Sequence, residues 1–263
     1  MADVINIPEH EIGNGVFSMK VEGPSLYKPV NDSYEEYICY KASKLLMEGR
    51  FAEAEEEYKF AIHLGNRKAV MHYATSLDMG WIGRQDCELA MMLYRDLAYK
   101  RYPIAMYNYG IMLSLGRGVR QNLKRAAMWN DRAADAGLDI AMTQKAIRLA
   151  YMSEADPDYK TALELLSRAA SLGDEEAMYQ LGRFYLKGMH VDRDYEKAAE
   201  WFQKAVQNGE GCFAELSLAK CYHTGKGVPK DDEKARELMS QAIEHGLPEE
   251  FCHKWDGECG LRH

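Results

Sequence analysis

The sequence predicts an all-α protein, a solenoid of about six antiparallel helix pairs, and three features support this fold class. Segments about 36 residues apart align with one another, each aligned segment has the apolar spacing of helices, and glycines follow the expected helix ends. A fixed period of this size indicates stacked supersecondary units. No single unit can bury its apolar face alone, so the copies must stack.

The period is clearest in a loop between two expected helices. The stretch YLKGMHVDRDYEKAAEWF (185–202) aligns with LSLGRGVRQNLKRAAMWN (113–130), 72 residues upstream, so that Gly188 falls on Gly116. When the sequence is shifted by 36 residues, half of that distance, the segment aligns with another copy at 139–174. Further copies lie upstream and downstream. The loop therefore belongs to a unit that the chain repeats.

Each unit is predicted to form a helix, a loop and a second helix. In AMYNYGIMLSLG, Met106, Tyr109, Gly110 and Leu113 lie at positions i, i+3, i+4 and i+7, which form one face of a helix. A glycine such as Gly116 suits the left-handed residue that ends a helix. The middle of the first helix has a small residue in every copy, which lets two helix backbones approach closely: Ala74, Gly110, Ala146, Gly182 and Ala219.

Charge and composition argue against several classes of function. The chain has 263 residues and a net charge of −8, so it would repel nucleic-acid phosphates. It has no apolar run of about 20 residues, the length a membrane helix needs, and its first residues do not resemble a signal peptide. We therefore expect a cytoplasmic protein with reduced cysteines, without nucleic-acid or membrane partners.

The aligned positions resemble the Sel1-like repeat, a relative of the tetratricopeptide repeat with a longer interhelical loop. The copy at 175–210 matches its signature best, the copy at 103–138 nearly as well, and the copy at 211–246 has a strong form of the loop, GKGVPKDDEKA. The matching positions in the best copy are Ala177, Leu181, Gly182, Tyr185, Gly188, Val191, Tyr195, Lys197, Ala198, Trp201, Lys204, Ala205 and Gly209.

The resemblance covers about residues 34–247 and weakens in places. The loop of the copy at 67–102 has no Gly-x-Gly-Val, and the loop of the copy at 139–174 has lost the glycine altogether. The front segment looks more like a plain tetratricopeptide unit. The resemblance implies a right-handed superhelix whose first helices line the concave side, and such arrays usually hold peptides or protein partners. Fold similarity alone does not specify an activity.

Two segments lie outside the predicted array. Residues 1–33 form an N-terminal extension with many glycines and prolines, expected to be either a flexible leader or an arm anchored on the first repeats. Residues 248–263 form a C-terminal segment in which Phe251 and Trp255 are expected to cap the exposed end of the stack.

Two groups of residues have side chains that could form a metal site or a catalytic site, but in both cases the spacing or the missing motifs favour no such site. Cys252, His253, Cys259 and His263 have ligand-type side chains, but their spacing fits no standard zinc site, so we expect no metal and no cofactor. A disulfide between Cys252 and Cys259 is equally disfavoured in a reducing compartment. Ser217 and Lys220 match the S-x-x-K motif of penicillin-interacting enzymes, but the companion motifs S-D-N and K-T-G are absent.

The predicted concave groove gives the candidate binding residues. Counted from the small crossing residue, the groove-facing positions combine apolar and aromatic side chains with polar neighbours, which suits an extended peptide or a partner helix. The alternative is that Tyr107 and Tyr179 only pack between repeats, because aromatic residues at helical spacing usually belong to the core. The predicted groove residues are Met71, Tyr107, Ile111, Ile147, Tyr179, Arg183 and Lys220.

These observations predict a non-enzymatic scaffold or adaptor that binds an unidentified protein or peptide through its concave groove. One alternative is a weak β-lactam-interacting hydrolase of the Sel1-like type. Another is a regulatory array whose groove is occupied by residues 1–33. A local basic patch is expected either to be solvated or to steer an acidic segment of a partner; it consists of Arg117, Arg120, Lys124, Arg125 and Arg132.

Overall fold

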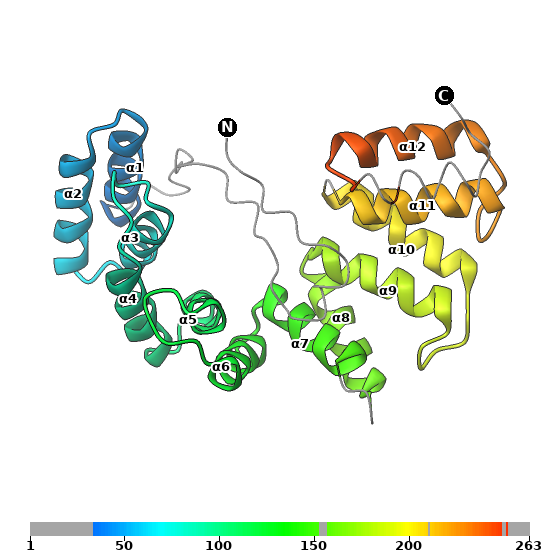
Figure 1. The fold of residues 1–263 in the computed structure, drawn as a ribbon, viewed down its shortest axis with the longest axis horizontal. Coiled ribbons are helices and arrows are strands. Elements are labelled where there is room, and N and C mark those ends of the chain that lie inside the picture. Colours follow the sequence, from blue (N-terminus) through cyan, green and yellow to red (C-terminus); the bar gives the residue numbers. More distant parts are fainter. Residues whose placement is uncertain (1–33, 153–156, 210, 249–250, 252–263) are drawn as a thin grey trace. The chain divides into compact units, whose positions relative to one another are not determined.

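The computed structural model describes residues 34–152, 157–209, 211–248 and 251 of the chain. This part contains twelve α-helices and no strand (Figure 1). The helices are α1 (Tyr34–Met47), α2 (Phe51–His63), α3 (Arg67–Met79), α4 (Cys87–Tyr99), α5 (Pro103–Leu115), α6 (Leu123–Asp135), α7 (Asp139–Tyr151), α8 (Tyr159–Ser171), α9 (Glu175–Lys187), α10 (Tyr195–Asn208), α11 (Cys212–Thr224) and α12 (Asp232–Glu244). The expected all-α repeat solenoid is confirmed.

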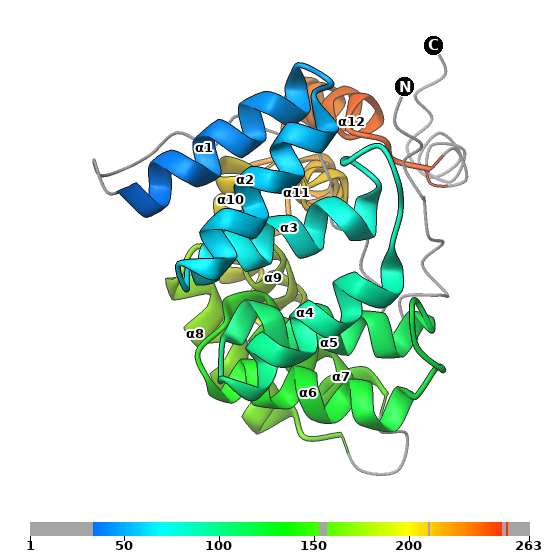
Figure 2. The same cartoon turned by 90° about the vertical axis from the view of Figure 1, so that its left-hand side faces the viewer.

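The chain divides after Ala141 into two compact units, which are described separately. In the N-terminal unit, each helix from α1 to α6 packs against the next helix in the chain, and α1 also contacts α3 (Figure 2). In the C-terminal unit, α8 to α12 pack in the same sequential way, with α9 beside α10 and α11 beside α12 (Figure 1). None of the described helices combines the length and apolar character that a membrane span requires.

Each second helix from α4 onward begins with the same local structure. An Asp or Asn accepts a hydrogen bond from the backbone N–H three residues later, which satisfies one of the free donors at the start of the helix. The acceptor recurs at the repeat spacing, at Asp86, Asn122, Asp158, Asp194 and Asp231. The first helices α3, α5, α9 and α11 end in left-handed glycines, as the sequence predicts: Gly80, Gly116, Gly188 and Gly225.

The small crossing residue lies where the two helices of a repeat meet. All five crossing positions are buried. A Cβ atom built on Gly182 would lie 2.5 Å from Phe202 Cε1 on the second helix, and one on Gly110 would overlap the Asn130 side chain. The sequence interpretation of this position is correct, because the contact leaves no room for a side chain at either glycine.

A second close approach joins neighbouring repeats. Gly118 and Gly227, in the interhelical loops, have φ values of 63° and 78°. A Cβ atom on either would overlap the backbone carbonyl of Cys87 or Tyr195, each at the start of the preceding repeat's second helix. His190 occupies the same register position and also has a positive φ, of 57°. The loop glycine therefore provides both a left-handed backbone and the space in which two repeats touch.

The described residues include only a small part of the two predicted end segments. Phe251 packs its ring edge-on against Phe213, with 5.6 Å between the ring centroids, and contacts the core of the C-terminal unit. Residues 1–33, Trp255 and the Cys252, His253, Cys259 and His263 cluster lie outside the described residues.

Candidate functional site

The predicted groove residues all lie on first helices, but they belong to both units. In the N-terminal unit they are on α3 and α5, and in the C-terminal unit on α7, α9 and α11. We call these two surfaces the N-terminal and C-terminal first-helix faces. Met71, Ile111, Tyr179 and Arg183 are partly exposed and Lys220 is exposed. Tyr107 and Ile147 are only 5% and 4% exposed, so both side chains are buried.

Arg183 is the best-positioned polar group of the C-terminal first-helix face. Its guanidinium carbon lies 4.9 Å from the ring centroid of Tyr151 on α7 and 5.8 Å from that of Tyr179 on α9. The side-chain oxygen Oε1 of Gln180 accepts from Arg183 Nη1 and from the Tyr151 hydroxyl, both at 3.2 Å. Two aromatic rings and a buried amide thus hold the cation in one orientation.

No carboxylate of the described residues forms an ion pair with Arg183. The nearest acid in its network is Glu176, whose Oε1 accepts from Gln180 Nε2 at 2.6 Å. Burial raises the pKa of Glu176 to about 7, and the Asp174 carboxylate acts in the same direction, against the hydrogen bond from Gln180. Near neutral pH the face therefore contains a fixed cation beside a partly protonated acid.

The raised pKa of Glu176 makes the stability of the C-terminal unit depend on pH. An unfolded glutamate has a pKa of about 4.3, so between about pH 4.3 and 7 the folded chain keeps a proton that the unfolded chain loses. The free energy of unfolding should therefore fall as the pH rises through this window. We expect Glu176→Gln to raise it by about 1–3 kcal/mol at pH 8 and to change it little at pH 4.

Urea unfolding of both proteins at a series of pH values measures this difference. A glutamine retains an acceptor for Gln180, so the variant removes the ionisation and keeps the hydrogen bond. Equal stability of the two proteins at pH 8, or a gain of the same size at both pH values, would show that Glu176 is not protonated in the way we describe.

The N-terminal first-helix face has an ion pair in place of an unpaired cation. Arg117 Nη2 lies 2.9 Å from Asp78 Oδ1 and donates to the Asp78 backbone carbonyl at 2.7 Å. The Oδ1 contact is an ion pair without an aligned hydrogen bond. Burial raises the pKa of Asp78, against the opposing charge of Arg117. The pair links the end of α3 to the loop after α5.

The predicted basic patch is not a set of equivalent free cations. Arg117 is paired with Asp78, Arg125 donates to the Tyr109 hydroxyl at 3.2 Å, and Arg132 lies over the Trp129 ring. Arg120 and Lys124 are exposed. Of these three contacts, only Arg117 with Asp78 links two repeats, whereas Arg125 and Arg132 contact aromatic side chains of their own repeat.

The S-x-x-K motif lies on α11 without an arrangement that suggests catalysis. Ser217 is half-buried, Lys220 is exposed, and no hydrogen bond joins them. Two histidines have carboxylate partners that the sequence pattern does not reveal: His223 Nδ1 lies 2.7 Å from Asp232, and His245 Nδ1 lies 2.8 Å from Glu215. These bonds join α11 to α12 and support the last repeat.

No disulfide joins the described cysteines to one another, and no group of three His, Cys, Asp or Glu side chains within the described ranges could hold a metal. Cys39 and Cys221 are buried, and burial raises the pKa of Cys221 to about 11, which keeps its thiol protonated. They have the environment of small apolar residues.

Comparison with family models finds the Sel1 repeat at residues 103–138, 146–174, 175–210 and 213–247, which together make up more than half of the chain. The two preceding helix pairs, α1–α2 and α3–α4, lie outside these matches. This agrees with the weaker loop pattern of the first copies. A comparison with curated protein sequences finds no match.

Solved structures show similar arrays. A Sel1 repeat protein from Oxalobacter formigenes is 27% identical with a TM-score of 0.71, covering 78% of this chain and 84% of that one. A protective antigen of uropathogenic Escherichia coli strains, displaying an SLR fold, is 26% identical with a TM-score of 0.64; the match covers 82% of this chain and 49% of that one. An immunity protein from Pseudomonas aeruginosa, 20% identical with a TM-score of 0.59 and 88% and 90% coverage, shares the fold.

Proposed function

Because the chain belongs to the Sel1 repeat family, whose members typically serve as protein-interaction scaffolds, we propose that it is a non-enzymatic scaffold that binds a protein or peptide through its first-helix faces. The proposed contacts are the exposed and partly exposed residues of these faces, and the buried Tyr107 and Ile147 are not among them. These contacts are Met71, Ile111, Tyr179, Arg183 and Lys220.

The observation that carries this proposal is the position of Arg183. Its guanidinium is held by Tyr151, Tyr179 and Gln180, and no described carboxylate pairs with it. A preorganised arginine loses little conformational entropy when it binds a carboxylate or a backbone carbonyl. The aromatic rings beside it provide apolar surface of the kind that dominates the energy of protein interfaces.

Hydrolysis of β-lactams receives no comparable support. Ser217 has no hydrogen bond to Lys220, and the described histidines with carboxylate partners join α11 to α12. The regulatory alternative, in which residues 1–33 occupy the groove, concerns a segment outside the described residues. No contact of the described residues favours either alternative.

The proposal predicts a selective loss of binding when the charge of Arg183 is reversed. Full-length wild type, Arg183→Glu and Arg236→Glu would each be used to capture partners from the native host, followed by titration of a purified partner. Arg236 is exposed on the second helix α12, so its variant has the same charge change on a different face. We expect Arg183→Glu to weaken binding about tenfold or more and Arg236→Glu to leave it nearly unchanged.

Folding must be checked in the same samples, because Arg183 also contacts two aromatic rings. Far-ultraviolet circular dichroism and thermal unfolding should show a folded Arg183→Glu variant. If that folded variant binds its partner as tightly as the wild type, the C-terminal first-helix face is not the binding surface. If both charge reversals weaken binding equally, the effect is a general one of charge.

A further inference from the structure

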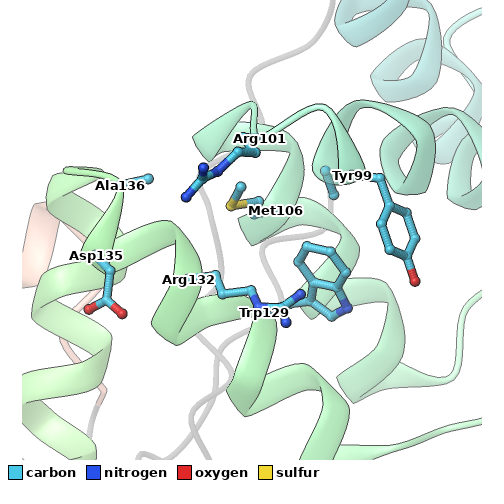
Figure 3. Close-up of a pocket in the computed structure, with 8 residues that line it drawn as sticks. Tyr99, Arg101, Met106, Trp129, Arg132, Asp135 and Ala136 are labelled. Carbon is cyan, nitrogen blue, oxygen red and sulfur yellow. The ribbon is translucent and has the colours of Figure 1, made fainter.

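A pocket of about 380 Å³ lies in the N-terminal unit, on the side formed by the second helices (Figure 3). Its walls come from the end of α4, the turn after it, the first part of α5 and the second half of α6. None of the predicted groove residues lines it. Six of its residues determine its charge and its apolar surface: Tyr99, Arg101, Met106, Trp129, Arg132 and Asp135.

Arg101 is in a strained backbone conformation at this pocket. Its φ is 63°, in the left-handed region that L-residues with a side chain rarely adopt. The corresponding residue 36 positions before or after is a left-handed glycine, Gly65 or Gly137, and Gly173 continues the pattern. The backbone at this position favours glycine, and the chain has an arginine there. Local strain of this kind clusters at functional sites.

The opposite wall is a rigid aromatic and cationic surface. The Arg132 guanidinium lies 4.7 Å from the Trp129 ring centroid. Tyr99 and Tyr109 pack against the same ring at steep angles, with centroids 5.2 and 5.5 Å away. Trp129 is buried and its Nε1 has no described acceptor, so ring contacts fix the indole. Tyr99 is 63% exposed, which leaves an aromatic surface at the rim.

The charges of the pocket are unbalanced. Within the described residues, neither Arg101 nor Arg132 forms an ion pair, whereas Arg50, Arg84 and Arg117 all do. Asp135 also lines the pocket, so its charged residues are two arginines and one aspartate. Figure 3 shows the Arg101 side chain extending toward the end of α6, which carries Arg132 and Asp135. The whole chain has a net charge of −8, so the excess of positive charge in this pocket is a local feature.

We infer that this pocket binds the carboxylate of an acidic, partly apolar peptide segment of a protein partner, at a site separate from the first-helix faces. A guanidinium donates two parallel hydrogen bonds to a carboxylate, which suits Arg101 and Arg132. Tyr99, which is 63% exposed, provides the apolar surface for the residue next to that carboxylate. Met106 and Trp129 also line the pocket but are almost fully buried. Asp135 disfavours a more highly charged phosphate. The inference does not depend on the function proposed above.

Nuclear magnetic resonance of the full chain can test this site directly. The probe is the peptide acetyl-Leu-Glu-Leu with a free terminal carboxylate, and its uncharged control is the amide of acetyl-Leu-Gln-Leu. We expect the acidic peptide to shift the Nε–H signals of Arg101, Arg132 and Trp129, and to bind about tenfold or more tightly than the control. Inorganic phosphate provides a second comparison.

Three variants separate charge from backbone strain. Arg101→Gln keeps a side chain on the left-handed backbone position and removes its charge. It should weaken binding of the acidic peptide about tenfold. Its unfolding midpoint should stay close to that of the wild type. Arg101→Gly restores the residue of the other repeats, so it should lose binding and also raise the unfolding midpoint. Arg120→Gln removes an exposed positive charge of the same unit outside the pocket and should leave binding unchanged.

The inference is overturned if Arg101→Gln and Arg120→Gln have the same effect, or if the uncharged peptide binds as well as the acidic one. It is also overturned if phosphate competes as strongly as the carboxylate. An Arg101→Gly variant that keeps full binding would show that the arginine has no role as a ligand-binding group.

Discussion

Replacing Gly182 with leucine is expected to lower the free energy of unfolding of the C-terminal unit by about 3 kcal/mol or more. A Cβ atom at this position would already lie 2.5 to 3.0 Å from three atoms of the Phe202 ring. Phe202 is fully buried, so its ring has no space into which it can move. The larger side chain must therefore separate α9 from α10. Thermal and urea unfolding, followed by circular dichroism, measure the loss.

The neighbouring repeat supplies a compensating control. Ala146 and Leu166 occupy the register positions of Gly182 and Phe202, and both are buried. Introducing that pair as Gly182→Ala with Phe202→Leu should cost much less than the sum of the two single changes, because the smaller residue makes room for the added methyl group. Simple additivity, or a Gly182→Leu protein as stable as the wild type, would show that this helix pair is not packed as described.

The sequence predicts the repeat because the repeat depends on local properties. Helical spacing, small crossing residues and glycine helix ends are all read within one unit of about 36 residues, and the helices confirm them. The copies at 67–102 and 139–174, whose loops lack Gly-x-Gly-Val, still form two helices each. Their second helices begin with the same side-chain cap as in the other copies, at Asp86 and Asp158.

The site is less predictable because it depends on contacts between repeats. Helical spacing assigns Tyr107 and Ile147 to the same face as Ile111, but it does not give the width of the buried stripe, which the neighbouring helices decide. Likewise, Arg183 and Tyr151 are 32 residues apart, and no pattern within one unit pairs them. The unusual backbone position of Arg101 could have been predicted from the sequence, because an arginine replaces the glycine found 36 residues away on either side.

The second large effect on the free energy of unfolding is expected from glycines in the interhelical loops. In each unit, one loop has two glycines whose replacement by alanine can be compared. Gly225 and Gly227 are both left-handed, with φ of 65° and 78°. Alanine at Gly225 would have its nearest contact at 3.4 Å, with the Lys230 side chain, and should cost about 1 kcal/mol for its backbone conformation. Alanine at Gly227 would overlap the Tyr195 carbonyl as well, and should cost on the order of 3 kcal/mol or more.

The difference between the two variants isolates the contact between repeats, because the left-handed penalty is common to both. A backbone carbonyl cannot turn away as a flexible side chain can, so relief at Gly227 requires the loop to move off the start of α10. Gly116 and Gly118 repeat the test in the N-terminal unit, with the Cys87 carbonyl in the same role. If Gly225→Ala and Gly227→Ala have the same free energy of unfolding, the loop glycine is needed only for its backbone angle, and the repeats are held together by their helices alone.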